Sequence, residues 1–242
     1  MISTVLFDLD GTLLPMDQEQ FTKAYFKKLG AFMSSLHEPE QLIKAVWAGT
    51  GAMIKNDGRK TNEAAFWDTY SGIFGPGSAS EEPIFADFYE NHFRELRPLC
   101  EPDPAVGPLT GALKKAGCTL AAATNPVFPM AAQLQRLSWS GADPQDFSHV
   151  TSYENSSFCK PNPSFYLEVL EKLGRTPQET LMVGNDVGED MDPALKTGMK
   201  VFLLTNCLLN KEGKDISAYP HGGYEDLRRF IGSLGISLPP ES

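Results

Sequence analysis

Four groups of polar residues in this sequence are of types that could do chemistry together. Two are rich in carboxylates, one pairs a hydroxyl with an amide, and one holds a lysine. Carboxylates act as nucleophiles, acids, bases and metal ligands, while hydroxyl and ammonium groups hold anions. The groups are Asp8-Leu9-Asp10-Gly11-Thr12, Thr124-Asn125, Cys159-Lys160-Pro161 and Gly184-Asn185-Asp186-Val187-Gly188-Glu189-Asp190.

Each group has an ordinary structural explanation when it is taken alone. The Asp-x-Asp-Gly stretch at 8–11 can be a simple turn, and Thr124-Asn125 can cap a helix. An isolated lysine such as Lys160 is usually solvated, and Asp186 and Asp190 suit the first turn of a helix. Their order favours a functional interpretation, because each group follows a segment with the pattern of a strand.

The elements that must position these groups alternate along the chain. Apolar segments predict strands at 4–7, 118–123, 149–151, 180–183 and 200–204. Helical spacing of apolar residues predicts helices near 109–116, 128–137, 165–173, 191–197 and 224–234. This alternation predicts an α/β fold with a parallel sheet covered on both faces. Ligands of such sheets bind beyond the carboxyl ends of the strands, so we expect the four groups to surround one pocket.

The stretch 16–96 has a different pattern, because its apolar residues recur at helical spacing throughout. Phe21, Tyr25 and Leu29 illustrate the four-residue step. We therefore predict an all-helical domain at 16–96, inserted into an α/β core made of 1–15 and 97–242. The spacing of its aromatic residues satisfies helix packing, so we interpret them as the hydrophobic core of the insert rather than a platform for a sugar or base.

Composition and charge exclude several classes of protein. The 242 residues are 41% hydrophobic and 21% charged, which is ordinary for a globular protein. The formal net charge of −10 disfavours nucleic acid and anionic lipid as partners. No apolar stretch is long enough to span a membrane. The four cysteines lie far apart, which indicates neither a disulfide framework nor a zinc site, so we expect a cytoplasmic protein.

The motifs and their order resemble those of the haloacid dehalogenase superfamily of phosphohydrolases and phosphotransferases. The segment Val5-Leu6-Phe7-Asp8-Leu9-Asp10-Gly11-Thr12-Leu13 is the most specific match. The resemblance implies a Rossmann-like core, and the position of the helical insert is similar to that of helical caps in phosphoglycolate phosphatase-like and phosphomutase-like members. Asn185 is a departure, because members commonly have Gly-Asp where this chain has Gly184-Asn185-Asp186.

The resemblance also implies a cofactor and a nucleophile. Mg²⁺ would be held by the Asp8 carboxylate, the Asp10 main-chain carbonyl and Asp186, since Mg²⁺ prefers oxygen ligands. Asp8 would attack phosphorus to form an aspartyl-phosphate, and Asp10 would serve as acid and then base.

The remaining motif residues would bind the phosphoryl group. Lys160 would supply positive charge, and Thr124 and Asn125 would lie at its oxygens. Asp190 would orient Lys160, although Glu189 could exchange places with it.

The insert is expected to select the substrate. Its loop 55–61 concentrates cations, so Arg59 and Lys60 are candidate substrate-binding residues. The alternative is a solvated loop in which Thr61 or Asn62 caps the next helix.

Three functions compete at this point. The first is a Mg²⁺-dependent phosphatase acting on a small phosphorylated metabolite, and the second is a phosphomutase of the β-phosphoglucomutase type. The third is a non-catalytic binding module that keeps the fold. Dehalogenation is disfavoured, because dehalogenases of the superfamily lack an acid at the position of Asp10. The sequence does not indicate an oligomeric state.

Overall fold

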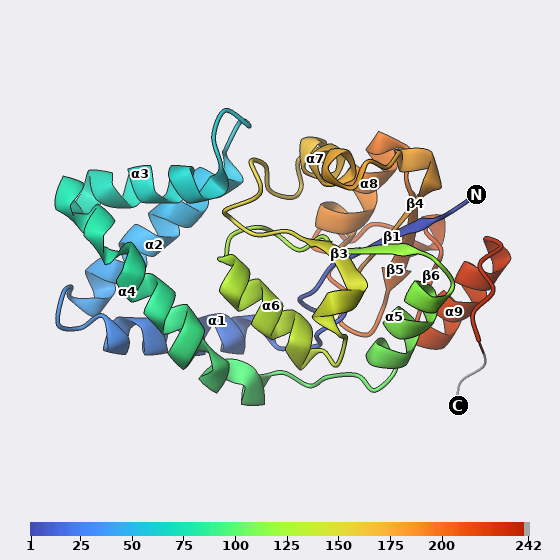
Figure 1. Cartoon of the computed structure of the whole chain (residues 1–242), viewed down its shortest axis with the longest axis horizontal. Helices are drawn as coiled ribbons and strands as arrows, with labels where there is room; N and C mark the ends of the chain where they lie inside the picture. Colours follow the sequence, from blue (N-terminus) through green and yellow to red (C-terminus); the bar gives the residue numbers. More distant parts are fainter. Residues whose placement is uncertain (240–242) are drawn as a thin grey trace.

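The core of the molecule is a six-stranded sheet with the order β3-β2-β1-β4-β5-β6 (Figure 1). The computed structural model describes residues 1–239. Every strand pairing is parallel, which confirms the predicted α/β class. The strands are β1 (Thr4–Phe7), β2 (Thr119–Ala122), β3 (Phe147–Val150), β4 (Thr180–Gly184), β5 (Lys200–Leu204) and β6 (His221–Gly222). The two-residue strand β6 is the one that the sequence pattern did not predict.

Alternating side chains of the strands bury both faces of the sheet. In β1, Val5 and Phe7 pack into one hydrophobic cluster, whereas Leu6 packs into the other. The first cluster contains residues of α5 (Val106–Lys115), α6 (Met130–Trp139) and α9 (Tyr224–Ser233). The second contains residues of α7 (Pro163–Leu173) and α8 (Asp192–Thr197). The sheet is therefore the middle of three layers, as a sheet with two apolar faces requires.

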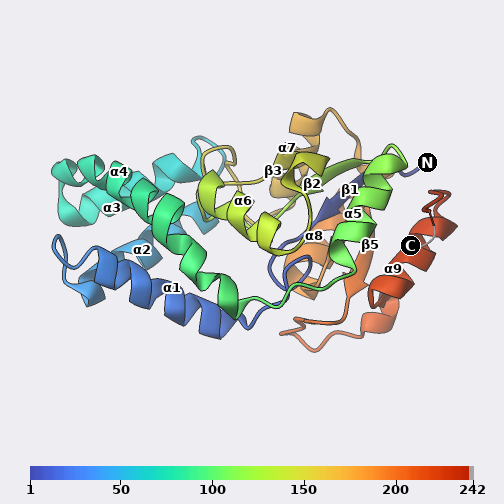
Figure 2. The same cartoon turned by 60° about the horizontal axis from the view of Figure 1, so that its bottom comes forward.

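The predicted helical insert lies at one end of the molecule, away from the sheet (Figures 1 and 2). It consists of α1 (Gln18–Phe32), α2 (Pro39–Ile54), α3 (Asn62–Phe74), η1 (Pro76–Glu81), α4 (Glu82–Asp87), η2 (Phe88–His92) and η3 (Phe93–Leu99). The two connections to the core run side by side, because Met16 and Cys100 form an antiparallel bridge and the Glu101 amide donates to the Pro15 carbonyl at 3.0 Å.

Short helical turns complete the core. They are η4 (Pro144–Asp146), η5 (Pro177–Glu179), η6 (Val187–Met191) and η7 (Ile216–Ala218). Within residues 1–239, no helix is both long and apolar enough to cross a membrane. All of the predicted strands and core helices are present, with their ends shifted by a few residues at most.

Candidate active site

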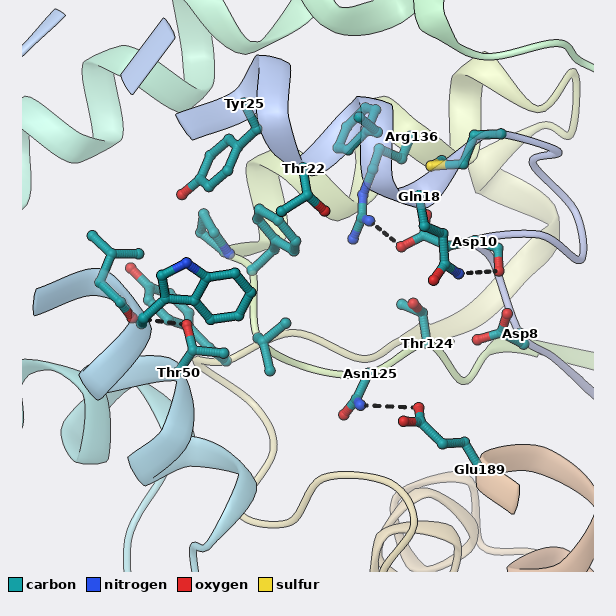
Figure 3. A pocket seen from close by; sticks show the side chains of 18 of the residues that line it. Asp8, Asp10, Gln18, Thr22, Tyr25, Thr50, Thr124, Asn125, Arg136 and Glu189 are labelled. Atoms are coloured by element: carbon teal, nitrogen blue, oxygen red, sulfur yellow. Dashed lines mark hydrogen bonds and ion pairs between the residues drawn. The ribbon is translucent and has the colours of Figure 1, made fainter. Parts of the chain in front are cut away.

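The polar groups that follow the strands meet at a single cavity. Asp8 comes directly after β1, while Thr124 and Asp186 each come two residues after β2 and β4. Phe7 pairs with both Ala122 and Val183, so these three strands end at nearly the same level. The cavity has a volume of about 270 Å³, and its lining includes Asp8, Asp10, Thr124, Asn125, Asp186, Glu189 and Asp190. Figure 3 shows several of these side chains around the open space.

Lys160 is not among the residues that line the cavity, but it joins two of the acids that do. Its Nζ donates to Asp8 Oδ1 and to Asp190 Oδ1, both at 2.7 Å, and only 1% of its side chain is exposed. Burial opposes the charged form, but the carboxylates of Asp190 and Asp8 outweigh it and raise the pKa of Lys160 well above its ordinary value. Lys160 is therefore a fixed cation beside Asp8.

Asp190, rather than Glu189, is the acid that holds Lys160. The second oxygen of Asp190 accepts from the amides of Asn185 and Asp186 at 3.1 and 3.0 Å, so one carboxylate fixes both the lysine and the loop after β4. Glu189 instead accepts from Asn125 Nδ2 at 3.3 Å. A Cβ on Gly184 would lie 2.3 Å from Asp190 Oδ2, so the strand must end in glycine to leave room for this carboxylate.

Asp10 lies at the cavity and forms an ion pair with the buried Arg136 of α6, while 27% of the Asp10 side chain stays exposed. Burial is the largest influence on the Asp10 carboxyl and raises its pKa; the Arg136 charge opposes this effect and the Asp8 charge adds to it. The net effect of these influences is a pKa of Asp10 above its ordinary value.

The turn between Asp8 and Thr12 depends on a glycine and an asparagine. Gly11 has φ +85°, and a Cβ at this position would lie 2.4 Å from the Asn185 side chain. Asn185 Oδ1 accepts from Thr12 Oγ1 at 3.0 Å, and its Nδ2 donates to the Cys207 carbonyl at 2.7 Å. The residue that departs from the usual Gly-Asp pattern thus ties the loops after β1, β4 and β5 together.

The donor set at the cavity suits a magnesium ion. Asp186 uses Oδ1 to accept from the amides of Gly188 and Glu189 at 2.7 and 3.0 Å, and Lys160 engages only Oδ1 of Asp8. The Asp10 carbonyl accepts a long contact of 3.4 Å from Gln18. Two carboxylates and one carbonyl can therefore offer oxygen atoms, and Mg²⁺ commonly keeps waters at its other positions.

Clusters of three or more His, Cys, Asp or Glu side chains able to hold a metal do not occur in residues 1–239. The oxygen donors proposed for Mg²⁺ do not form such a cluster, because only Asp8 and Asp186 contribute side chains and the third donor is the main-chain carbonyl of Asp10.

Figure 3 shows Thr124 beside Asp8, and the Asn125 side chain facing Glu189. Thr124 is buried, and its carbonyl accepts from Thr151 Oγ1 at 2.6 Å, which fixes the loop after β2. Asn125 Oδ1 is buried without a hydrogen-bond partner, and both residues line the cavity.

Arg59 and Lys60 are not brought to the cavity. Arg59 pairs with Asp57 and keeps 86% of its side chain exposed, and Lys60 pairs with Asp68. Neither lines the cavity wall. Thr61 caps α3 by accepting from the Ala64 amide at 3.2 Å, as in the alternative interpretation of this loop. Local carboxylates thus pair with both cations in this structure, and their contact with substrate stays a prediction.

Sequence reasoning missed two features of the cavity. One is Arg136. A charged residue on the buried face of an amphipathic helix, together with Gln133 on the same face, was the sequence signal that could have indicated it. The other is the aromatic character of the wall formed by the insert, which includes Phe26, Trp47 and Trp67. Helical spacing reveals that such residues face inward, but it cannot distinguish a packed core from a cavity wall.

The sequence is similar to those of proteins named as phosphatases. A "Phosphoglycolate phosphatase" of Aquifex aeolicus is 25% identical over 200 residues, covering 82% of this chain and 83% of that protein. A "Pyrophosphatase PpaX" of Bacillus mycoides is 28% identical and covers 76% and 75% of the two chains.

Solved structures share the fold. A phosphatase of the same superfamily from Thermococcus onnurineus superposes with a TM-score of 0.58 at 20% identity, covering 96% of this chain and 98% of the other. A 2-haloacid dehalogenase from Pseudomonas syringae pv. Tomato gives 0.60 at 19% identity, with coverages of 97% and 100%. The sequence model of the haloacid dehalogenase-like hydrolases matches residues 2–198. This chain therefore belongs to the haloacid dehalogenase-like hydrolase family, and it is an enzyme of the hydrolase class.

Proposed function

We propose that the protein is a Mg²⁺-dependent phosphatase that hydrolyses a phosphate monoester of a small metabolite through an aspartyl-phosphate. The observation that carries this proposal is the placement of Asp8 beside the buried Lys160 at a cavity that Asp10 and Asp186 also line. Relatives named as phosphatases, among them a "Glyceraldehyde 3-phosphate phosphatase" of Methanopyrus kandleri at 26% identity, support the reaction class.

The first half of the reaction uses Asp8 as nucleophile and Asp10 as acid. The Asp8 carboxylate, which Lys160 holds at 2.7 Å, attacks phosphorus through one of its oxygens, and its other oxygen would stay with the metal. As the new O–P bond forms, the ester O–P bond breaks and Asp10 gives its proton to the leaving oxygen. When bound by Asp8, Asp186 and the Asp10 carbonyl, Mg²⁺ supplies charge that reduces the repulsion between carboxylate and phosphate.

The second half releases phosphate. Asp10, now ionised, takes a proton from a water molecule that attacks the aspartyl-phosphate, and the Asp8 carboxylate is restored when its O–P bond breaks. Lys160 and the Thr124 hydroxyl stabilise charge on the phosphoryl oxygens. Asp190 keeps Lys160 in place, and Arg136 keeps Asp10 in place.

The helical insert acts as a cap in this proposal. Residues 16–96 would cover the core formed by 1–15 and 97–242, exclude water and contact the organic part of the substrate. The four cysteines are free thiols, which supports a reducing compartment such as the cytoplasm.

Removal of the metal tests the proposal. Protein treated with EDTA is expected to release phosphate from a panel of phosphate monoesters at least about 100-fold more slowly, because a metal ion contributes several kcal/mol to transition-state stabilisation. Added MgCl₂ should restore the rate, as followed by a colorimetric phosphate assay. A panel that yields no phosphate in the presence of Mg²⁺ would contradict the proposal, and isomerisation of a sugar phosphate without free phosphate would favour a mutase.

A further inference from the structure

The wall of the cavity formed by the helical insert is mainly aromatic. In Figure 3 the acids Asp8 and Asp10 lie on one side of the open space, and Tyr25 and Thr50 lie across from them. Rings from α1, α2, α3, α4 and η2 line the cavity, together with rings from the loops before α6 and after β3. They are Phe21, Tyr25, Phe26, Trp47, Phe66, Trp67, Phe85, Tyr89, Phe128 and Tyr153.

Trp47 is the most exposed of these aromatic residues, and packing inside the protein does not account for its exposed surface. Trp47 keeps 53% of its surface exposed, although its ring is tilted against Phe26 with a centroid distance of 5.1 Å. A large exposed aromatic side chain that lines a cavity is typical of a ligand-binding surface. Trp47 and Phe26 thus offer apolar surface that a bound molecule could cover.

The same wall lacks positive charge. Among the described residues that line the cavity, the cations are Arg136 and Lys211, and neither belongs to the insert. Arg136 is already paired with Asp10 and lies over the Phe128 ring at 4.5 Å. The polar lining residues from the insert, Gln18, Thr22 and Thr50, are uncharged.

These observations restrict the organic part of the substrate. A second anionic group, such as a carboxylate or another phosphate, that lay against the rings of the insert would find no cation of the insert beside it and would lose hydration without compensation there; Lys211 and Arg136 belong to the core part of the lining. An uncharged ring would instead cover the exposed face of Trp47. Resting on the phosphatase activity proposed above, we propose that the substrate is a phosphate monoester whose organic group is uncharged and carries an apolar ring.

The test compares esters whose leaving oxygens have similar reactivity. For 2-phenylethyl phosphate, kcat/KM is expected to exceed that for phosphoglycolate by about 100-fold, because the carboxylate of phosphoglycolate has no partner in the wall. In Trp47→Ala, KM for 2-phenylethyl phosphate should rise about tenfold, as expected for loss of an aromatic contact, and more than kcat changes. Trp47→Phe should recover most of this loss.

A phenylalanine on the same insert gives a matched control. Phe32 lies on α1 and is partly exposed, as Phe26 is. Its ring packs on Phe88 and His92 at centroid distances of 5.5 and 4.7 Å, and it does not line the cavity. Phe32→Ala should therefore leave KM for the aryl ester unchanged, whereas Phe26→Ala should raise it.

The outcomes separate this inference from the proposed function. Hydrolysis of phosphoglycolate or pyrophosphate with a kcat/KM equal to or above that for 2-phenylethyl phosphate would overturn the inference and leave the phosphatase proposal intact. Failure to hydrolyse any ester would overturn the phosphatase proposal. Calorimetric titration with benzylphosphonate would then test the cavity directly: binding that Trp47→Ala weakens about tenfold supports an aryl site, and absence of binding to the unsubstituted protein overturns it.

Discussion

Asp8→Asn is expected to abolish phosphate release while leaving the protein folded. An amide is a very poor nucleophile towards phosphorus, and it also removes a charged ligand from the proposed metal site. The fold should persist because Lys160, the buried partner of Asp8, still has Asp190 at 2.7 Å as a counterion. The measurement is a phosphate-release assay with Mg²⁺, accompanied by circular dichroism to compare the thermal unfolding of the two proteins.

A conservative variant serves as the control for Asp8→Asn. Asp8→Glu keeps the charge beside Lys160 but moves the carboxylate by one methylene, so it should also lose most activity if Asp8 must attack in line. Turnover of Asp8→Asn at a rate close to that of the unsubstituted protein would eliminate Asp8 as the nucleophile.

Lys160→Met is expected to reduce both activity and stability. Loss of one electrostatic group that stabilises the transferring phosphoryl should lower kcat by a factor on the order of 10²–10³. The substitution also leaves Asp190, with 2% of its side chain exposed, without its cation. Breaking a buried ion pair by removing one partner costs about 3–5 kcal/mol of unfolding free energy. Urea denaturation and steady-state kinetics measure the two effects.

A second substitution separates the two roles of Lys160. In Lys160→Met/Asp190→Asn, the amide oxygen at 190 can still accept from the amides of Asn185 and Asp186, which Asp190 Oδ2 holds at 3.1 and 3.0 Å. Most of the lost unfolding free energy should therefore return, but kcat should stay low. A double variant that regains both properties would show that Lys160 acts on the fold alone.

The sheet and its polar loops were predictable from sequence because they depend on local patterns. Continuous apolar segments marked the buried parallel strands, and residues such as Asp8 and Asp186 stood directly after them. Parallel pairing then brings the carboxyl ends of neighbouring strands to one edge, so the meeting of these acids followed from topology. Their proposed catalytic roles stay predictions until the variants are measured.

Other features of the site depend on contacts that no local pattern encodes. Arg136 reaches Asp10 across 126 positions of sequence, and the choice of Asp190 over Glu189 depends on how the turn η6 rotates each side chain. Arg59 and Lys60 looked suitable as anion-binding residues because of their charge, but the nearby acids Asp57 and Asp68 neutralise them. Charge in a sequence shows what a residue can bind, and only the fold shows which partner it has.

The reaction of Asp10→Asn with 4-nitrophenyl phosphate reveals whether Asp8 carries the phosphoryl group during turnover. Nitrophenolate leaves without a proton, so the first step should proceed, whereas hydrolysis should stall without the base. We expect a burst of nitrophenolate equal to the enzyme concentration, and a phosphoryl group on the peptide that contains Asp8, as detected by mass spectrometry after acid quench. Linear release from the first turnover, with no added mass on that peptide, would contradict this role of Asp8.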